Sequence, residues 1–315
     1  MKITVSHIID DKEMKTLEGQ YFNEDFFDTI ITEDCDCFKD DGTILFKFRK
    51  NRISKELCQI AKNSYTKYSK TKHSNRGVSA GMLDKNKLPS YVGKFVECGT
   101  FRTGYISNTS GLKSKQKITN LAQSNIAGYF DKPDRNIIGT KEQCRETAFN
   151  IKYPELWEQS LPFLKRCDQL FQELMPLRHY RQYLRSDLSP NFKIPNTSFS
   201  TITLNYSWRT AAHQDAGDYK DGFGNLVILE DEKNPNTYQG CYLGFPQYGI
   251  AVDVREGDFL TMDVHEYHCN TEFKPTHDRV EGKFKNRDII NHWYLNRMSV
   301  VLYLRENMNI CENDR

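Results

Sequence analysis

The sequence has 315 residues, of which 38% are hydrophobic and 27% are charged. This length suits one large domain or two small ones, and no apolar run is long enough for a transmembrane helix. A formal charge of +2, from 44 basic and 42 acidic residues, excludes a polybasic protein of the histone kind. The sequence has nine cysteines, an odd number, and the apolar stretch at its start is too short for a secretory signal. These features predict reduced thiols and no disulfide framework. They also predict a cytoplasmic or nuclear-accessible location.

Charge is unevenly distributed along the first half of the chain. Residues 1–41 are dominated by Asp and Glu, whereas residues 47–117 are rich in Lys and Arg with aromatic residues between them. Such a basic and aromatic segment is a candidate surface for a phosphate backbone, although charge runs are more often solvated faces. Residues 74–140 are rich in Gly, Ser and Asn, which predicts loops and short strands.

The clearest helical pattern covers residues 154–184. Its apolar residues recur at helical spacing, which predicts a helix with one face on the core; they are Leu156, Trp157, Leu161, Leu164, Cys167, Leu170, Phe171 and Leu174. Pro154 suits a first helical turn. Pro162 and Pro176 are expected to kink or divide the helix.

From Phe199 onward the pattern changes to short, β-branched segments. Strands are expected at Phe199–Ser207, Leu226–Glu230, Cys241–Phe245, Ile250–Val254, Phe259–Val264 and Ser299–Leu304. Turns rich in Gly, Pro, Asn and Asp separate these segments, and the spacing predicts an antiparallel barrel or sandwich. The helices that precede it are expected to pack on its outside.

Two histidines and one carboxylate in this β-rich part form a candidate metal site. His213 and Asp215 are two residues apart, so they share one face of the chain if it is extended. His268 lies well downstream, at the exit of another expected strand. Two imidazoles and one carboxylate are the facial triad of non-haem Fe(II) oxygenases, which leaves one face of the metal open for a co-substrate and O2. The ordered set carries this prediction, because a His-x-Asp pair alone is a weak signal.

The second histidine of the site is a choice between His265 and His268. They differ by three positions, so they point to opposite faces if they share one extended strand. His265 falls inside the expected strand and His268 at its exit, where a ligand at the mouth of a barrel is expected. We therefore expect His268 to be the ligand and His265 to be a neighbouring or outward-facing residue.

An arginine is expected nearby if the co-substrate is 2-oxoglutarate, because its distal carboxylate needs a bidentate partner. Arg297 and Ser299 open the last strand and share one of its faces. Arg305 has the same parity as Arg297, so the strand pattern does not separate the two arginines. Asn205, on the strand that leads into the ligands, either contacts the co-substrate or belongs to the strand ladder.

Three passages resemble the TET/JBP branch of the 2-oxoglutarate and Fe(II)-dependent dioxygenases, which includes phage and viral members. They read TSFSTITLNYSWRTAAHQDAGDYKDGFGNLVILED, GCYLGFPQYGIAVDVREGDFLTMDVHEYHCNTE and NRMSVVLYLRE. The likeness covers about residues 145–306, with looser likeness upstream in SNRGVSAG and SNIAGYFDKPDRN.

The resemblance implies an α+β fold with a double-stranded β-helix (jelly-roll, cupin-like) core, scaffold helices packed outside it and an N-terminal mixed α/β elaboration. It implies that Fe(II) is held by His213, Asp215 and His268. It also implies that 2-oxoglutarate is held by Arg297 with Ser299, which favours Arg297 over Arg305. We expect residues 1–145 to form the elaboration, with a substrate-binding part, and residues 146–315 to form the helices and the dioxygenase core.

The resemblance also implies an activity. Characterised relatives hydroxylate the methyl group of a pyrimidine, so the expected reaction is hydroxylation of the 5-methyl group of thymine or 5-methylcytosine in DNA. Fe(II), 2-oxoglutarate and O2 are the expected cofactor and co-substrates, and ascorbate is expected to help in vitro. DNA is the expected partner, with no membrane and no obligate protein partner. Because a base in duplex DNA must be extruded to reach the metal, the candidate contacts in the basic segment are Arg76, Tyr91, Arg102 and Tyr105.

Two features depart from the family pattern. The charged stretch Asn270–Asn296, between the last ligand and the arginine, is long, which predicts a looped insertion near the mouth of the site. Cys35 and Cys37 have no partner pair at zinc-binding spacing, so they are expected to be ordinary thiols.

Other functions are compatible with the same residues. The fold hosts many substrates, and the near-neutral charge slightly favours a 2-oxoglutarate oxygenase acting on a protein side chain or a small metabolite. Outside the enzymes, the alternatives are an inactive jelly-roll binding module or a cupin-like structural or sugar-binding barrel. The complete set of His213, Asp215, His268, Arg297 and Ser299 argues against an inactive module.

Overall fold

The computed structural model describes most of the chain, namely residues 1–73, 76–82, 94–96, 103–107, 114–118, 120–132, 144–230, 238–275 and 297–311. Three short strands are described by their backbone alone and form a small antiparallel sheet. They are β5 (Lys94–Val96), β6 (Thr103–Ser107) and β7 (Ser114–Ile118).

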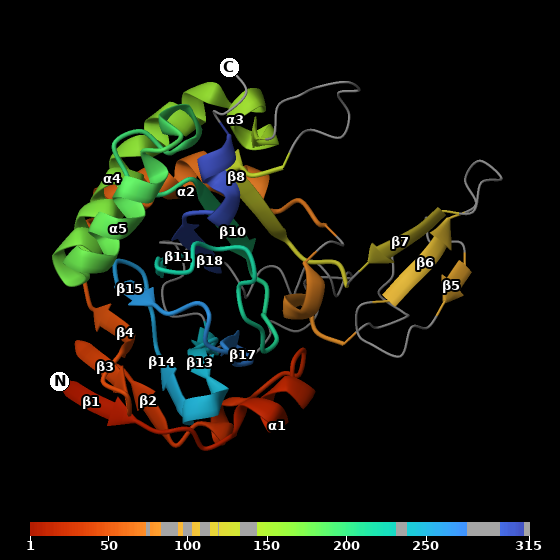
Figure 1. Ribbon diagram of the computed structural model, residues 1–315, viewed down its shortest axis with the longest axis vertical. Helices are drawn as coiled ribbons and strands as arrows, with labels where there is room; N and C mark the ends of the chain where they lie inside the picture. Colours follow the sequence, from red (N-terminus) through yellow and green to blue (C-terminus); the bar gives the residue numbers. More distant parts are fainter. Residues whose placement is uncertain are drawn as a thin grey trace, which may run out of the picture.

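Two sheets form the core of the molecule (Figure 1). The larger sheet has the order β1-β3-β4-β15-β11-β18-β10-β8-β9. Its strands are β1 (Lys2–Val5), β3 (Cys35–Lys39), β4 (Ile44–Arg49), β15 (Phe259–Met262), β11 (Gly224–Glu230), β18 (Arg297–Tyr303), β10 (Thr201–Tyr206), β8 (Ser124–Phe130) and β9 (Arg145–Glu146). The smaller sheet consists of β16 (Cys269–Asn270), β13 (Leu243–Phe245), β14 (Ile250–Val252) and β2 (Thr29–Ile31), and a separate pair joins β12 (Tyr238–Gly240) to β17 (Phe273–Pro275).

Four antiparallel strands at the centre of the larger sheet, β10, β18, β11 and β15, form one half of a double-stranded β-helix. The chain leaves β11 for β13 and β14 of the smaller sheet, returns to β15, crosses again to β16 and ends in β18. Two facing sheets joined in this way are a jelly roll. The expected double-stranded β-helix core is therefore confirmed, and each strand expected from the sequence is present with its boundaries moved slightly.

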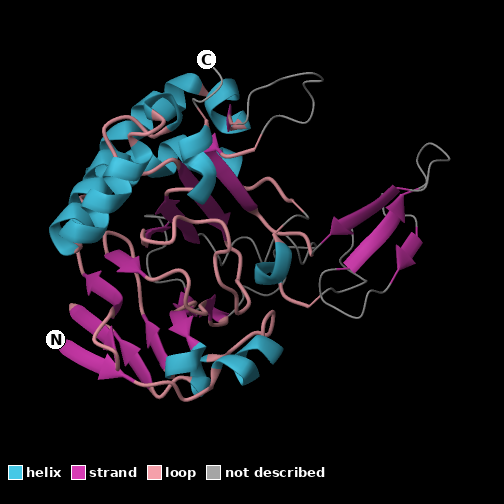
Figure 2. Ribbon diagram, in the orientation of Figure 1, coloured by secondary structure: helices cyan, strands magenta, loops and turns pink. Residues whose placement is uncertain are grey.

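Helices cover the outer face of the larger sheet (Figure 2). The described helices are α1 (Asp11–Thr16), α2 (Lys55–Ser69), α3 (Ala148–Lys152), α4 (Pro154–Leu174) and α5 (Pro176–Ser186). Of these, α2 and α4 lie over this face, whereas α1 packs by the smaller sheet. Short 3₁₀ turns are η1 (Glu24–Phe26), η2 (Gly77–Ala80), η4 (Pro190–Phe192), η5 (Pro246–Tyr248) and η6 (Glu306–Ile310). Among the described residues, no helix is both long and apolar enough to cross a membrane.

The helix predicted over residues 154–184 is two helices. The division at Pro176 is confirmed, whereas α4 continues through Pro162. A proline inside a helix removes one backbone hydrogen bond and crowds the preceding turn. The apolar stripe continues on both sides of this proline, with Trp157 and Leu164 buried against the core, and this packing keeps α4 in one piece.

Alternate residues of the larger sheet pack on opposite sides of it, as the two-residue period of a strand requires. Leu226 and Ile228 of β11 pack between the sheets in one cluster with Phe245. Val227 and Leu229 point the other way and pack under α2 and α4. Because each fully buried side chain of this kind contributes about 1.5–3 kcal/mol, the two layers fix the geometry of the strands between them.

Strands from the first 145 residues extend both sheets of the core. In the larger sheet β4 pairs with β15 and β8 pairs with β10, and in the smaller sheet β2 pairs in parallel with β14. These additions cover the edges of the β-helix, which otherwise expose unpaired backbone groups. The division of the chain into residues 1–145 and 146–315 stays a prediction.

Several basic residues of the segment 47–117 form ion pairs inside the molecule. The guanidinium of Arg49 lies 2.7 Å from the Asp36 carboxylate, and Lys47 lies 3.8 Å from it. The ammonium of Lys62 lies 3.0 Å from Glu256. These three cations therefore join elements of the fold to one another, and they form neither a solvated face nor a surface for phosphates.

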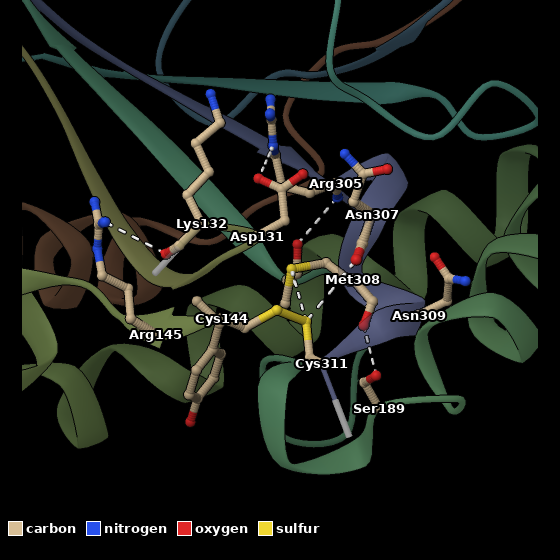
Figure 3. The surroundings of a disulfide bond; sticks show 12 residues. Asp131, Lys132, Cys144, Arg145, Ser189, Arg305, Asn307, Met308, Asn309 and Cys311 are labelled. Atoms are coloured by element: carbon tan, nitrogen blue, oxygen red, sulfur yellow. Dashed lines mark hydrogen bonds and ion pairs between the residues drawn. A yellow bond between two sulfur atoms is a disulfide. The ribbon is translucent and has the colours of Figure 1, made fainter. Parts of the chain in front are cut away.

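One pair of cysteines corrects the expectation of reduced thiols. Cys144, just before β9, forms a disulfide with Cys311, just after η6 (Figure 3). The two residues are 167 positions apart in the sequence, so no local pattern announces their contact. The other described cysteines are buried thiols outside any disulfide, as expected for the first two, namely Cys35, Cys37, Cys58, Cys167, Cys241 and Cys269.

Candidate active site

A cavity of about 980 Å³ opens between the two sheets beside β8, β10 and β18. We call its buried part, lined by Leu243, Met262, Arg297 and Ser299, the inner end. We call the more exposed part, lined by Phe130, Lys132, Arg145 and Ile151, the outer end. Strand β18 runs between them, and its length from Arg297 to Tyr303 corresponds to roughly 20 Å.

His213, Asp215 and His268 meet in this cavity. The Nε2 atom of His213 lies 3.6 Å from Oδ1 of Asp215, and the Nε2 atom of His268 lies 3.7 Å from Oδ2 of the same carboxylate. One candidate ligand atom from each residue lies within 4.8 Å of the other two. These separations place three nitrogen and oxygen donors around one point, where they can share an ion.

The backbone brings these distant residues together. His213 and His268 form an antiparallel bridge in which each N–H donates to the carbonyl of the other, at 3.1 and 3.0 Å. The N–H of Asp215 donates to the carbonyl of Val264 at 3.0 Å. The segment after β10 is therefore held against the segment before β16, and the two imidazoles lie side by side with ring centroids 4.4 Å apart.

Each imidazole is oriented by its own backbone. Nδ1 of His213 lies 2.8 Å from the carbonyl of Ala211, and Nδ1 of His268 lies 3.0 Å from the carbonyl of Glu266. A hydrogen bond from Nδ1 to a carbonyl places the free lone pair on Nε2, which is the usual arrangement of a metal-ligating histidine. Burial, followed by the neighbouring His268, lowers the pKa of His213 to about 4, so this imidazole is neutral at pH 7.

His265 lies outside the cluster. The premise that residues 265 and 268 share one extended strand is wrong, because β15 ends at Met262 and a turn follows. Within this turn Nε2 of His265 lies 3.3 Å from the carbonyl of Tyr219. Lys39 of β3 holds the turn through ion pairs to Asp263, at 3.3 Å, and Glu266, at 2.8 Å.

A buried arginine marks the inner end of the cavity. Arg297 is only 3% exposed, and its Nε atom has no hydrogen-bond partner among the described residues. Ser299 lies two residues along β18 and opposite Asn205 of β10, and all three side chains line the cavity. The Oδ1 atom of Asn205 accepts a hydrogen bond from the Ser124 hydroxyl. A buried donor without a partner is costly, so this end of the cavity is built for an acceptor.

Arg305, the other arginine considered for 2-oxoglutarate, already has carboxylate partners. Arg305 lies 3.1 Å from Asp131 and 3.6 Å from Asp218. Burial, then the nearby Asp215 and Asp131, raises the pKa of Asp218 well above its usual range, while Arg305 opposes the shift. Sequence reasoning missed Asp131, Asp218 and Tyr303 as lining residues. Strand parity signals Tyr303, which shares a face with Arg297, but the aspartates join the site through long-range pairing.

Of the four residues expected to contact nucleic acid, one is described with its side chain. Arg76 lines the cavity, its Nε donates to the carbonyl of Ser124 at 3.3 Å, and burial lowers its pKa. Tyr91 and Arg102 lie outside the described residues, and Tyr105 lies in β6, where the backbone alone is described. Of the expected insertion at 270–296, the structure describes the part up to β17.

Comparison with known proteins gives a family match over the cavity-bearing part. Residues 125–306 match the family described as "Tet_JBP: Oxygenase domain of the 2OGFeDO superfamily". The chain is 35% identical over 193 residues to "Bifunctional helicase and thymine dioxygenase JBP2" of Leishmania major, covering 58% of this chain and 16% of that protein. It is 30% identical over 234 residues to "Thymine dioxygenase JBP1" of Trypanosoma brucei brucei, covering 73% of this chain and 24% of that protein.

The chain thus spans between 16% and 24% of the length of these two curated relatives. Among solved structures, "NgTET1 in complex with 5mC DNA" is similar with a TM-score of 0.48 and 12% sequence identity, covering 96% of this chain and 93% of that one.

Proposed function

The chain belongs to the Tet_JBP family of oxygenase domains in the 2OGFeDO superfamily, and from this membership we propose that it hydroxylates the 5-methyl group of thymine or 5-methylcytosine in DNA, using Fe(II), 2-oxoglutarate and O2. The observation that carries the proposal is the cavity in which two histidines and one carboxylate lie beside a buried arginine whose Nε has no partner among the described residues. Both curated relatives are named as thymine dioxygenases, which favours thymine as the base.

The donor set fits Fe(II). Two imidazoles presenting Nε2 and one carboxylate, with an open cavity on the remaining side, are the ligands of the facial-triad oxygenases. We assign His213, Asp215 and His268 as the ligands. When bound there, Fe(II) supplies the chemistry by which O2 and 2-oxoglutarate oxidise a C–H bond. The protein keeps the His213 imidazole neutral and orients both imidazoles through their Nδ1 contacts to backbone carbonyls.

The inner end fits 2-oxoglutarate. A carboxylate beside Arg297 would give the buried Nε its missing acceptor, and a guanidinium binds a carboxylate through two parallel hydrogen bonds. The hydroxyl of Ser299 lies on the same strand face, and Asn205 lies opposite it in register. We assign Arg297 and Ser299 to the distal carboxylate and Asn205 to a neighbouring polar contact.

The rest of the cavity suits an extruded base. A target base leaves the duplex stack before an enzyme can modify it, and a volume of about 980 Å³ is at the upper end of the range for sites that enclose a small ligand. Beyond the triad the lining becomes polar and aromatic, with Arg76, Tyr303 and the pair of Asp218 and Arg305. We propose that this part receives the base, so that Arg76 acts inside the cavity rather than on an outer surface.

Mass spectrometry of nucleosides tests the proposal. DNA containing thymine, and matched DNA containing 5-methylcytosine, is incubated with the protein, Fe(II), 2-oxoglutarate and ascorbate, and then digested. We expect a hydroxymethyl base in at least one of the two DNAs, and none with the matched Asp215→Asn variant. Succinate formation with no oxidised base in either DNA would point to a protein side chain or metabolite as the substrate.

A further inference from the structure

The outer end of the cavity gathers cations around one aromatic ring. Phe130, the last residue of β8, has Lys132 at 5.9 Å, Arg145 at 5.5 Å and Arg305 at 4.9 Å from its ring centroid. All four residues line the cavity that contains the triad. Phe130, Lys132 and Arg145 were not among the nucleic-acid contacts expected from the sequence, which lie elsewhere on the chain.

The backbone fixes the positions of these cations. Arg145 lies opposite Phe130 in the β8–β9 pair, where cross-strand side chains are in contact range. Its guanidinium donates to the carbonyl of Lys132 at 3.3 Å. The neighbouring disulfide, between Cys144 and Cys311, ties β9 to the segment after η6. Figure 3 shows Lys132 and Arg305 extending to the same side, away from the disulfide.

The charges at this end are unequally balanced. Arg305 has two carboxylates, Asp131 and Asp218, within ion-pair distance. Lys132, which is exposed, has no ion pair with any described residue. Glu146, the residue after Arg145, lies opposite Tyr129 in the β8–β9 pair. Burial, followed by the nearby Glu146 carboxylate, raises the pKa of Tyr129. Lys132 therefore lies beside Phe130 and Arg145 with no carboxylate of the described residues in ion-pair contact.

We propose that Lys132 and Arg145 bind a backbone phosphate of the DNA strand that carries the target base, with the Phe130 ring against the adjoining nucleotide. A nucleic-acid strand alternates anionic phosphates with flat apolar bases, and proteins meet it with cations beside aromatic rings. Ile151, which is 64% exposed and lines the same end, adds apolar surface beside the cations. This inference rests on the proposed function, because it takes the strand as the source of the base that enters the cavity.

The salt dependence of DNA binding tests this inference without any turnover. Anisotropy of a short fluorescent duplex gives the binding constant of the full chain in KCl from about 50 to 200 mM. The variant carrying Lys132→Ala and Arg145→Ala is expected to bind more weakly, and the magnitude of the slope of log K against log [KCl] should fall by about one, since one phosphate contact contributes about 0.9. The charge-retaining pair Lys132→Arg and Arg145→Lys should keep the wild-type slope.

A matched surface control removes one lysine and one arginine far from the cavity. Lys12 lies on α1 and Arg181 on α5, and both are exposed, so Lys12→Ala with Arg181→Ala should leave the slope unchanged. An unchanged slope in the Lys132 and Arg145 double variant, or an equal fall in the surface control, would overturn the phosphate site.

Base oxidation measured on the same samples separates the two proposals. If the wild-type protein oxidises DNA while the double variant keeps the wild-type slope, the phosphate site fails and the proposed function stands. If the slope of the double variant falls in magnitude by about one while the wild-type protein oxidises no base, the proposed function fails and the phosphate site stands.

Discussion

The two ends of the cavity are built differently. At the inner end Arg297, which opens β18, is 3% exposed, and His268, which directly precedes β16, is 5% exposed. At the outer end Lys132 is exposed and Arg145 is half-buried. Arg145 belongs to β9 and Lys132 follows β8, which are the strand pair added at the edge of the larger sheet. The groups proposed for chemistry are thus buried and rigid, whereas those proposed for recognition are open to water.

This difference has an electrostatic consequence. Exposed charges are screened by salt over about 10 Å at 0.1 M ionic strength, whereas buried groups are screened much less. Substitutions at the inner end should therefore produce large losses that salt hardly changes. Substitutions at the outer end should produce smaller losses that depend on salt.

Removing a proposed metal ligand should have the largest effect. His268→Ala or Asp215→Ala leaves two donors in place of three, so we expect loss of Fe(II) binding and of succinate production at every salt concentration, with the circular dichroism spectrum unchanged. Isothermal titration with Fe(II) under argon measures the first and a succinate assay the second. His265→Ala, in the adjoining turn, is the matched control and should retain both Fe(II) binding and succinate production. Full succinate production by His268→Ala would contradict the ligand assignment.

Removing the buried arginine should come next. Truncating one partner of a buried charge pair costs about 2–5 kcal/mol, so Arg297→Leu should weaken 2-oxoglutarate binding by roughly 30-fold or more. Titration of 2-oxoglutarate into the metal-loaded protein measures this. Arg305→Leu, which leaves the inner end intact, should bind 2-oxoglutarate nearly as the wild type does. The reverse order of the two effects would reassign the co-substrate to Arg305.

Breaking the disulfide tests the support of the outer end. Cys311→Ser removes a link that closes a very long loop, and such links contribute about 2–4 kcal/mol to the free energy of unfolding. Urea denaturation should show this loss, and added reductant should destabilise the wild type but have no further effect on the variant. If reductant leaves the wild type unchanged, Cys144 and Cys311 are not bonded in solution.

Acid should destabilise the metal-free protein through the inner end. Because the pKa of His213 is lowered to about 4 from about 6.5 in the unfolded chain, the unfolded state binds more protons between these two values. The free energy of unfolding should therefore decrease as the pH is lowered through this window, by up to about 1.4 kcal/mol per pH unit. The decrease should end below about pH 4. Urea denaturation with a chelator measures it, and a His213→Gln variant that keeps the same slope would contradict this source.

The sequence allowed the core to be predicted because its strands follow a local two-residue period, whereas the triad was predicted from the ordered set of its residues and from the family resemblance. Alternation placed β10, β11 and β18, and two-residue spacing placed Arg297 beside Ser299. His268 was preferred for its place at the exit of a strand, yet the assumed continuous strand is a turn held by Lys39, a residue far away in the sequence. The ion pairs of Arg305 and the disulfide of Cys144 also join distant segments, and no local pattern encodes such contacts.

The account's central claim is that one cavity joins a buried oxidising end to an outer end that holds DNA. The most direct test measures succinate and hydroxymethyl base in the same reaction on thymine-containing DNA. We predict about one hydroxymethyl base for each succinate, since one oxygen atom of O2 enters each product, and neither product with Asp215→Asn. Succinate formed at full rate with the DNA bases unchanged would contradict the account.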